Sequence, residues 1–271
     1  MRRRILAVGA ATALAVFGLA LPAQAADQAQ LSVLHAVPGL TVDVYVDGER
    51  TLNDFEPGTL AGPLKLDAGT YSVAITAADA DDDSDPAIGP VDLELESGGN
   101  YTAVAHLNAD GDPTATLFTN DTSKTEAGQG RLTVRHVAAA PAVDVLAGGD
   151  PVVEDLSNPD EASLDLDAGT IEAAVAATGT TDPVIGPADV TVEEGALTIA
   201  YAWGSLEDEN LKLAVQTISG LHSGPGGVHG GEAGLASAGS LPGVFAALGV
   251  GLAAALVVRR SLRSAPARSA R

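Results

Sequence analysis

The chain has 271 residues, no cysteine, 3% aromatic residues and a formal net charge of −22 at pH 7. The lack of cysteine excludes disulfides, thiol nucleophiles and thiolate metal sites, and the shortage of aromatic residues argues against broad stacking platforms for sugars or bases. The negative charge argues against nucleic acid and anionic lipid as partners.

The first 25 residues have the pattern of a secretory signal peptide. Three arginines at positions 2–4 precede an apolar run over 5–21, and Ala-Gln-Ala at 23–25 forms a small-x-small cleavage site. This order is typical of a signal that is removed after export. A retained membrane helix is the alternative, which the shortness of the run disfavours. We therefore expect the mature chain to lie outside the cytoplasm.

Two long stretches of the remaining chain repeat each other at a spacing of about a hundred residues. The matching pieces are His35 with His136, Val42-Asp43-Val44 with Val143-Asp144-Val145, 66–70 with 166–170, and 85–90 with 182–187. Two copies are too few, and the period too long, for a solenoid. The sequence therefore predicts two tandem domains, at 31–121 and 131–219.

Within each copy the apolar residues alternate with polar ones, as in strands of an antiparallel sheet with one packed and one solvated face. The alternation is clear over 42–46, 71–77, 91–95 and 171–175. Turn signals separate these runs, among them Asp47-Gly48 and Gly98-Gly99. Seven or eight short strands per copy favour an all-β fold of two antiparallel β-sandwiches, immunoglobulin-like or transthyretin-like. A barrel is the alternative.

The first copy also carries a specific set of motifs: His-Ala-x-Pro at 35–38, the Val-Asp-Val-Tyr-Val-Asp-Gly run at 42–48, and Leu-x-Ala-Gly-Thr-Tyr at 66–71. With these motifs the chain resembles the bacterial family known as domain of unknown function 4397. The resemblance covers about residues 31 to 219, and the second copy departs from it at Leu146, Gly148 and Ile171. It implies an extracytoplasmic β-sandwich, often in tandem and often anchored, and assigns no catalytic residue.

Two pairs of residues recur in both copies and are candidates for a role. His35 and His136 share a strand face with apolar residues, so we expect buried, hydrogen-bonded structural histidines rather than ligands or acid–base groups. Asp43 and Asp144 fall on the opposite face. We therefore expect them to face solvent as turn or edge residues, and not to form a catalytic pair.

The acidic run 79–85 is an insertion present only in the first copy. Its Asp81, Asp83 and Asp85 are the candidate metal ligands, because carboxylate oxygens are what Ca²⁺ prefers. A second oxygen-rich loop lies at 108–112, but neither loop has the 12-residue calcium pattern with its closing Glu. A solvated loop is the alternative interpretation. We expect no cofactor, with weakly bound Ca²⁺ as the one candidate.

The C-terminal end has the pattern of a membrane anchor. A Gly-rich linker at 220–240 precedes 18 uncharged residues at 241–258, and five arginines follow in the tail at 259–271. Eighteen residues span about 27 Å as a helix, and a basic flank marks the cytoplasmic side. This end resembles a Gram-positive cell-wall sorting signal, but Leu241-Pro242 is not followed by the sortase motif's Thr-Gly. We therefore favour a single-pass membrane protein over a cell-wall-associated one.

The region between signal and anchor holds all 36 acidic residues and only six basic ones, a net charge of −30. It contains no nucleophile elbow, no HExxH and no phosphate-binding Gly loop. The sequence thus predicts a non-enzymatic cell-surface protein for adhesion, envelope organisation or ligand binding. Its expected partners are the membrane and an extracellular protein or polymer, without nucleic acid. The alternative is a calcium- or small-ligand-binding module, and a wall-polymer hydrolase is a weaker third reading.

Overall fold

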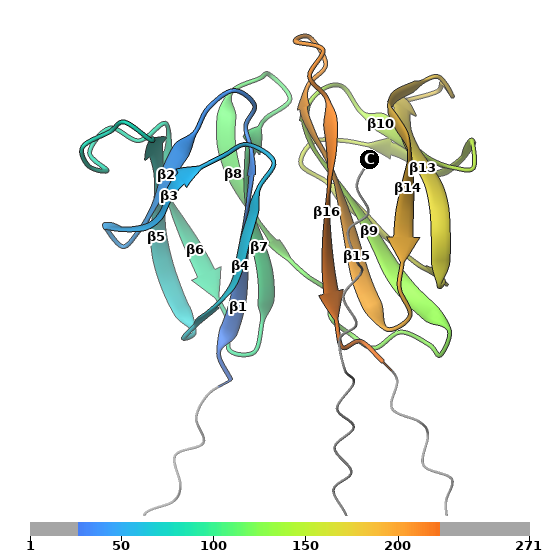
Figure 1. Ribbon diagram of the computed structural model, residues 1–271, viewed down its shortest axis with the longest axis horizontal. Coiled ribbons are helices and arrows are strands. Elements are labelled where there is room, and N and C mark those ends of the chain that lie inside the picture. The colour runs from blue at the N-terminus through green and yellow to red at the C-terminus, as the bar shows by residue number, and fades with distance from the viewer. Residues whose placement is uncertain (1–26, 223–271) are drawn as a thin grey trace, which may run out of the picture. The chain divides into compact units, whose positions relative to one another are not determined.

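The computed structural model describes residues 27–222, which form sixteen β-strands and no helix (Figure 1). The first half contains β1 (Ala29–Ala36), β2 (Val42–Val46), β3 (Glu49–Phe55), β4 (Leu60–Leu66), β5 (Gly69–Ala77), β6 (Ile88–Leu95), β7 (Asn100–Leu107) and β8 (Pro113–Thr119). The second half contains β9 (Gln129–Ala139), β10 (Val143–Ala147), β11 (Asp150–Leu156), β12 (Glu161–Asp167), β13 (Gly169–Ala177), β14 (Pro183–Val192), β15 (Ala196–Ser205) and β16 (Lys212–Ser219).

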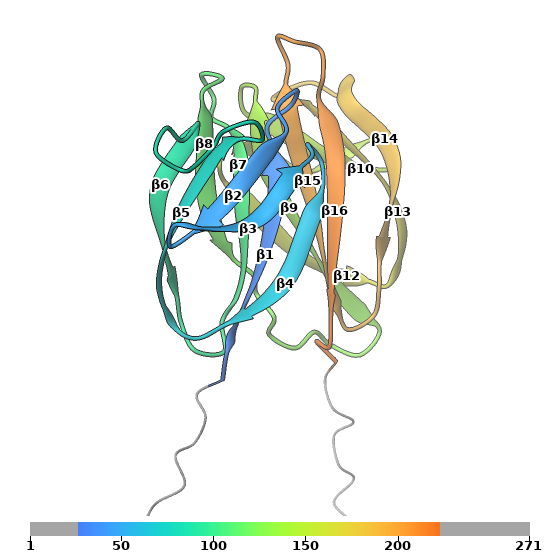
Figure 2. The ribbon, with the colours of Figure 1, turned by 60° about the vertical axis from the view of Figure 1, so that its left-hand side comes forward.

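Each half is a sandwich of two four-stranded sheets, which confirms the all-β prediction with eight strands per copy. The first sandwich has the sheet orders β4-β1-β7-β8 and β3-β2-β5-β6, and the second repeats them as β12-β9-β15-β16 and β11-β10-β13-β14 (Figures 1 and 2). Each sheet is open, with two edge strands, so the barrel alternative is wrong. The segments predicted to be the signal peptide, the anchor helix, the basic tail and nearly all of the linker lie outside the described residues. Within 27–222, no helical segment is present that would be long and apolar enough to cross a bilayer.

One strand pair in each copy departs from the predicted antiparallel arrangement. β1 runs parallel to β7, and β9 runs parallel to β15, while all other pairs between named strands are antiparallel. The reason is that the chain leaves the β4-β1-β7-β8 sheet after β4, forms β5 and β6 in the other sheet, and then returns. On its return β7 lies beside β1 in the same direction, an arrangement that a run of hairpins would not produce.

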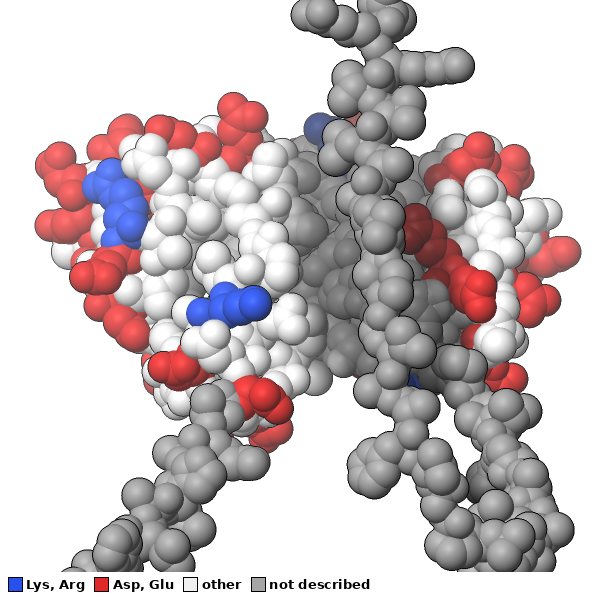
Figure 3. All heavy atoms as spheres, turned by 60° about the horizontal axis from the view of Figure 1, so that its bottom comes forward, with Lys and Arg blue, Asp and Glu red and all other residues white. Residues whose placement is uncertain are grey.

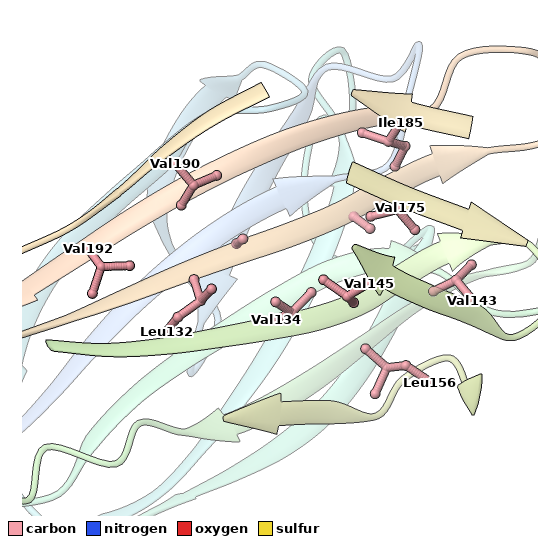
Figure 4. Close-up of a cluster of buried hydrophobic side chains, with 11 residues drawn as sticks. Leu132, Val134, Val143, Val145, Leu156, Val175, Ile185, Val190 and Val192 are labelled. Atoms are coloured by element: carbon pink, nitrogen blue, oxygen red, sulfur yellow. The ribbon is translucent and has the colours of Figure 1, made fainter. Parts of the chain in front are cut away.

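Each sandwich has a core of aliphatic side chains from the facing sheets. In the second sandwich, Leu132 and Val134 of β9 lie opposite residues of β10, β13 and β14 (Figure 4). The first sandwich has equivalent clusters around Val44 and Ile75 and around Leu31 and Leu93. These residues are the inward-facing members of the predicted alternation, so the period of two identifies the core correctly.

The prediction of one solvated face is wrong for the central strands of two sheets. All ten residues of β15 are buried, and so are seven of the eight in β7. The cause is a further apolar cluster, in which residues of the β4-β1-β7-β8 sheet pack against residues of the β12-β9-β15-β16 sheet. We call this contact the seam; its cluster consists of Leu34, Ala36, Val104, Phe118, Val137, Leu197, Ile199, Tyr201, Trp203 and Leu221.

Candidate functional site

The two recurring histidines are buried structural residues, as predicted. His35 is 1% exposed and donates from Nε2 to the carbonyl of Leu40 at 2.6 Å. His136 is equally buried and donates from Nε2 to the carbonyl of Pro141 at 3.0 Å. Burial lowers the pKa of both imidazoles, because the charged form loses its hydration. Each ring therefore holds the loop after its strand in place as a neutral donor.

The recurring aspartates are buried, so the expectation that they face solvent is wrong. Asp43 accepts the backbone N–H of Asp54 at 2.8 Å, and Asp144 accepts the equivalent N–H of Asp155 at 2.9 Å. Asp54 and Asp155 both have positive φ, at 50° and 59°, which a non-glycine residue rarely adopts. The buried carboxylate thus stabilises an irregular strand end, and this explains why Val-Asp-Val is repeated.

The two aspartates differ in how their second oxygen is used. Asp43 Oδ2 lies 3.1 Å from Arg50 Nη1, whereas Asp144 Oδ2 accepts the N–H of Gly179 at 2.8 Å. The two backbone hydrogen bonds hold the pKa of Asp144 below its usual value. The second copy therefore uses backbone donors and the Thr178 side chain at a site where the first uses a backbone donor and a guanidinium.

The predicted calcium ligands lie in the loop between β5 and β6. Asp81 and Asp85 are exposed and Asp83 is half-buried near Gly48, at the turn between β2 and β3. Asp82 accepts the N–H of Ser84 at 3.0 Å, and hydrogen bonds from Ser84 lower its pKa. Over residues 27–222, no three His, Asp or Glu side chains gather in a way that would hold a metal ion.

The seam contains the largest fully buried side chain of the described region, Arg135. Its Nε donates to Glu161 at 2.7 Å, Nη1 to the Tyr201 hydroxyl at 3.0 Å and Nη2 to Asn120 Oδ1 at 2.9 Å. Its guanidinium carbon also lies 4.3 Å from the ring centre of Phe118. Asn120 and Phe118 belong to the first copy, so this arginine joins the two sandwiches.

A chain of buried hydrogen bonds continues from Arg135 across the seam. Gln216 Oε1 accepts from the Tyr201 hydroxyl at 2.6 Å and from the Thr102 hydroxyl at 3.1 Å. Asn120 Nδ2 donates in turn to Thr102 Oγ1 at 3.0 Å and to Asn100 at 2.7 Å. Burial raises the pKa of Tyr201, so this hydroxyl stays a donor. The network fixes one alignment of the two sheets, because a shift would leave buried polar groups unpaired.

Loops on both sides strengthen the seam. Asn158, in the turn before β12, donates from Nδ2 to the carbonyls of Leu107 at 2.8 Å and Ala138 at 2.6 Å, one in each sandwich. The segment between the sandwiches is held by Arg131, which pairs with Asp165 at 2.8 Å and with Asp121 at 2.7 Å. The connection therefore lies against the second sandwich over its first residues.

Two kinds of cavity are candidate ligand sites. One lies within each sandwich core, of about 90 Å³ in the first and 110 Å³ in the second. Equivalent residues line both, including Val44 with Val145 and Ile75 with Val175. The other is a cleft of about 130 Å³ at the seam, which we call the seam cleft. It is lined by Leu34, Gly58, Leu60, Tyr201, Trp203, Leu213, Ala214, Val215 and Gln216.

Comparison with known proteins gives a family and no relative. The model of the family described as "Domain of unknown function (DUF4397)" matches residues 29–146. The match covers all eight strands of the first sandwich, then β9 and most of β10. No curated protein matches the chain. The strand order shows the duplication beyond the matched span, since the second sandwich repeats the first strand by strand. The first sandwich, together with β9 and most of β10, therefore matches the DUF4397 family.

Proposed function

We propose that the protein is a non-enzymatic cell-surface protein that displays its two sandwiches as one rigid body outside the membrane. The seam is the observation that carries this proposal. An interface with its own apolar cluster and a buried hydrogen-bond network resists the domain motion expected of loosely linked domains. A rigid pair suits presentation of a fixed surface for adhesion or envelope organisation.

Sequence features outside the described residues support the same placement. The signal-like segment at 1–25 would export the chain, and the apolar segment at 241–258 with its basic tail would keep it in the membrane. The acidic exterior, with basic side chains few among many carboxylates (Figure 3), suits a soluble ectodomain that repels anionic lipid. The proposed partners are therefore the membrane, through the C-terminal segment, and an extracellular protein or polymer.

The finer fold assignment is transthyretin-like. An immunoglobulin sandwich groups its first, second, fifth and fourth strands in one sheet. Here the first strand shares a sheet with the fourth, seventh and eighth, and this order recurs in the second copy. We therefore infer that both sandwiches are transthyretin-like rather than immunoglobulin-like.

Localisation is tested on intact cells with an epitope tag inserted at the exposed Asp110–Gly111 turn between β7 and β8. We expect the tag to be removed by external protease and the chain to fractionate with membranes. A variant that ends at residue 240 should appear in the medium. A tag protected from protease, or a truncated chain that stays with the membrane fraction, would contradict the proposal.

The alternative function is weak calcium binding by the acidic loop, favoured by the position of Asp83 over the β2–β3 turn. Calorimetry of the full chain with Ca²⁺ tests it, with Asp81, Asp83 and Asp85 all changed to Asn in the comparison protein. Heat at millimolar Ca²⁺ that disappears in the triple variant would support this role. Equal heats for both proteins, or none, would remove it.

A further inference from the structure

The outer strand of the seam sheet in the second sandwich, β16, has a free edge. It pairs only with β15 and lies last in its sheet, so one line of its backbone groups has no strand partner. Edge strands of this kind are templates for another strand, and proteins commonly protect them with charges or proline. β16 has neither in its interior: its one charge, Lys212, is its first residue, and no carboxylate lies within it.

The most exposed large apolar side chain of the described region lies at the middle of this strand. Val215 is 49% exposed, and Leu60, on the edge strand β4 of the first sandwich, is 42% exposed. Both line the seam cleft, together with the consecutive β16 residues Leu213, Ala214 and Gln216. The cleft therefore lies along the edge strand and continues the apolar cluster of the seam to the surface.

The wall of the seam cleft also includes a residue with an unsatisfied donor. Trp203 lines the cleft and is 3% exposed, and its indole Nε1 is buried with no hydrogen-bond acceptor. A buried N–H without a partner costs free energy that an acceptor from a ligand would recover. Gly58 forms part of the opposite wall, where a Cβ atom would lie 3.0 Å from Trp203 Cζ2. Glycine at this turn thus leaves room beside the indole.

We propose that an extended peptide segment of another protein adds to β16 as a further strand and places an apolar side chain in the seam cleft. Three observations select this ligand. The free edge offers the main-chain groups that a strand pairs with, the cleft offers an apolar pocket beside it, and the indole in its wall has an N–H that lacks an acceptor. Because both sandwiches line the cleft, the site exists only when the seam is closed. The inference deepens the proposed display role by naming the class of partner.

The test uses the full chain in maltoside micelles and a phage-displayed library of random dodecapeptides as the probe. Enriched peptides are synthesised and titrated, and the emission of Trp203, the only tryptophan of the chain, reports occupancy. We expect selected peptides to shift this emission. N-methylation of alternate peptide nitrogens should abolish binding in one register and leave the other unchanged, since only one set pairs with the edge.

Two variants and a matched control locate the site. Val215→Lys and Leu60→Lys, in different sandwiches, should each weaken binding by about tenfold or more, through loss of apolar contact. Val184→Lys changes an exposed valine (37%) on the edge strand β14, away from the seam cleft, and should leave binding within about twofold. Circular dichroism confirms that each variant is folded, and two independent variants keep the test valid if one is not.

Three outcomes would overturn the inference. The first is a selection that enriches no peptide over a parallel selection on Val215→Lys. The second is enriched peptides that bind Val215→Lys and Leu60→Lys as tightly as the original chain. The third is wild-type self-association that Val215→Lys disperses, which would make a second copy the occupant. None of these bears on protease access at the cell surface, so the display proposal is judged separately.

Discussion

The two sandwiches share their cores but differ at the faces that meet in the seam. The strand registers place Leu34 beside Val104 in the first copy and, at the equivalent positions, Arg135 beside Tyr201 in the second. The first copy thus contributes an apolar pair where the second contributes a charged donor and a hydroxyl. Two identical faces would bring like groups together, two buried arginines included. The comparison shows that a duplicated domain can keep its interior while its outer faces become complementary.

Removing the arginine should have the largest effect on this complementarity. We expect Arg135→Ala to lower the free energy of unfolding by about 3–5 kcal/mol, because Tyr201, Asn120 and Glu161 lose a buried charged partner. Urea unfolding measures the change. Lys65→Ala, at an exposed position of β4, is the control and should stay within about 0.5 kcal/mol. A loss of less than 1 kcal/mol for Arg135→Ala would mean that the seam contributes little to holding the sandwiches together.

The buried aspartates allow the same comparison inside each sandwich. Asp144→Ala leaves two backbone N–H groups without acceptors and should cost about 2–4 kcal/mol. Asp43→Ala leaves one N–H and frees a guanidinium that is already 38% exposed, so it should cost less. Thermal or urea unfolding of the two variants checks the order. Equal losses would show that the Arg50 contact is worth as much as the bond from Gly179.

The stability of the first sandwich should depend more on pH at one position, where it has a buried histidine and the second sandwich has none. His106 donates to the carbonyl of Leu107 and accepts from Thr116, and burial lowers its pKa, with a smaller contribution from His136. Trp203 occupies the equivalent position of the second copy. The unfolded chain takes up a proton as the pH falls through about 6.5 and the folded chain does not, so stability is complete above that pH and is lost below it.

Each such histidine should contribute up to about 1.4 kcal/mol of lost stability per pH unit below 6.5. The free energy of unfolding should therefore decrease less steeply between pH 6.5 and 5.5 in His106→Gln than in the original chain, by up to that amount per pH unit. This difference in slope does not depend on the stability of the variant at pH 7.5. His136→Gln should reduce the slope similarly, because burial lowers the pKa of that ring too. Unchanged slopes in both variants would show that these imidazoles charge inside the fold.

Sequence periodicity predicts what a strand does within its own sandwich and little about what covers its other face. The alternation over 42–46 and 71–77 identified the core residues, and the duplication predicted the two units. The burial of Arg135 was not predicted, because a single charged residue in a strand usually faces solvent. The better signal was in β15, where the apolar run at 199–203 is typical of a strand buried on both faces. The residues that cover the outer face of β15 belong to the other sandwich. A contact between residues so far apart in the chain cannot be predicted from a local sequence pattern.

The smallest expected effects concern the cavities within the two cores, where equivalent alanines have different surroundings. Ala105 lines the cavity of the first sandwich, whereas Ala202, its equivalent, does not line that of the second. Two added methyl groups in an empty apolar space gain burial, while the same groups in a filled core force neighbours apart. We expect Ala105→Val to raise the free energy of unfolding by about 1 kcal/mol and Ala202→Val to lower it by about 1–3 kcal/mol. Urea unfolding checks both, and a loss at Ala105 as large as that at Ala202 would mean that the first core is as tightly packed there as the second.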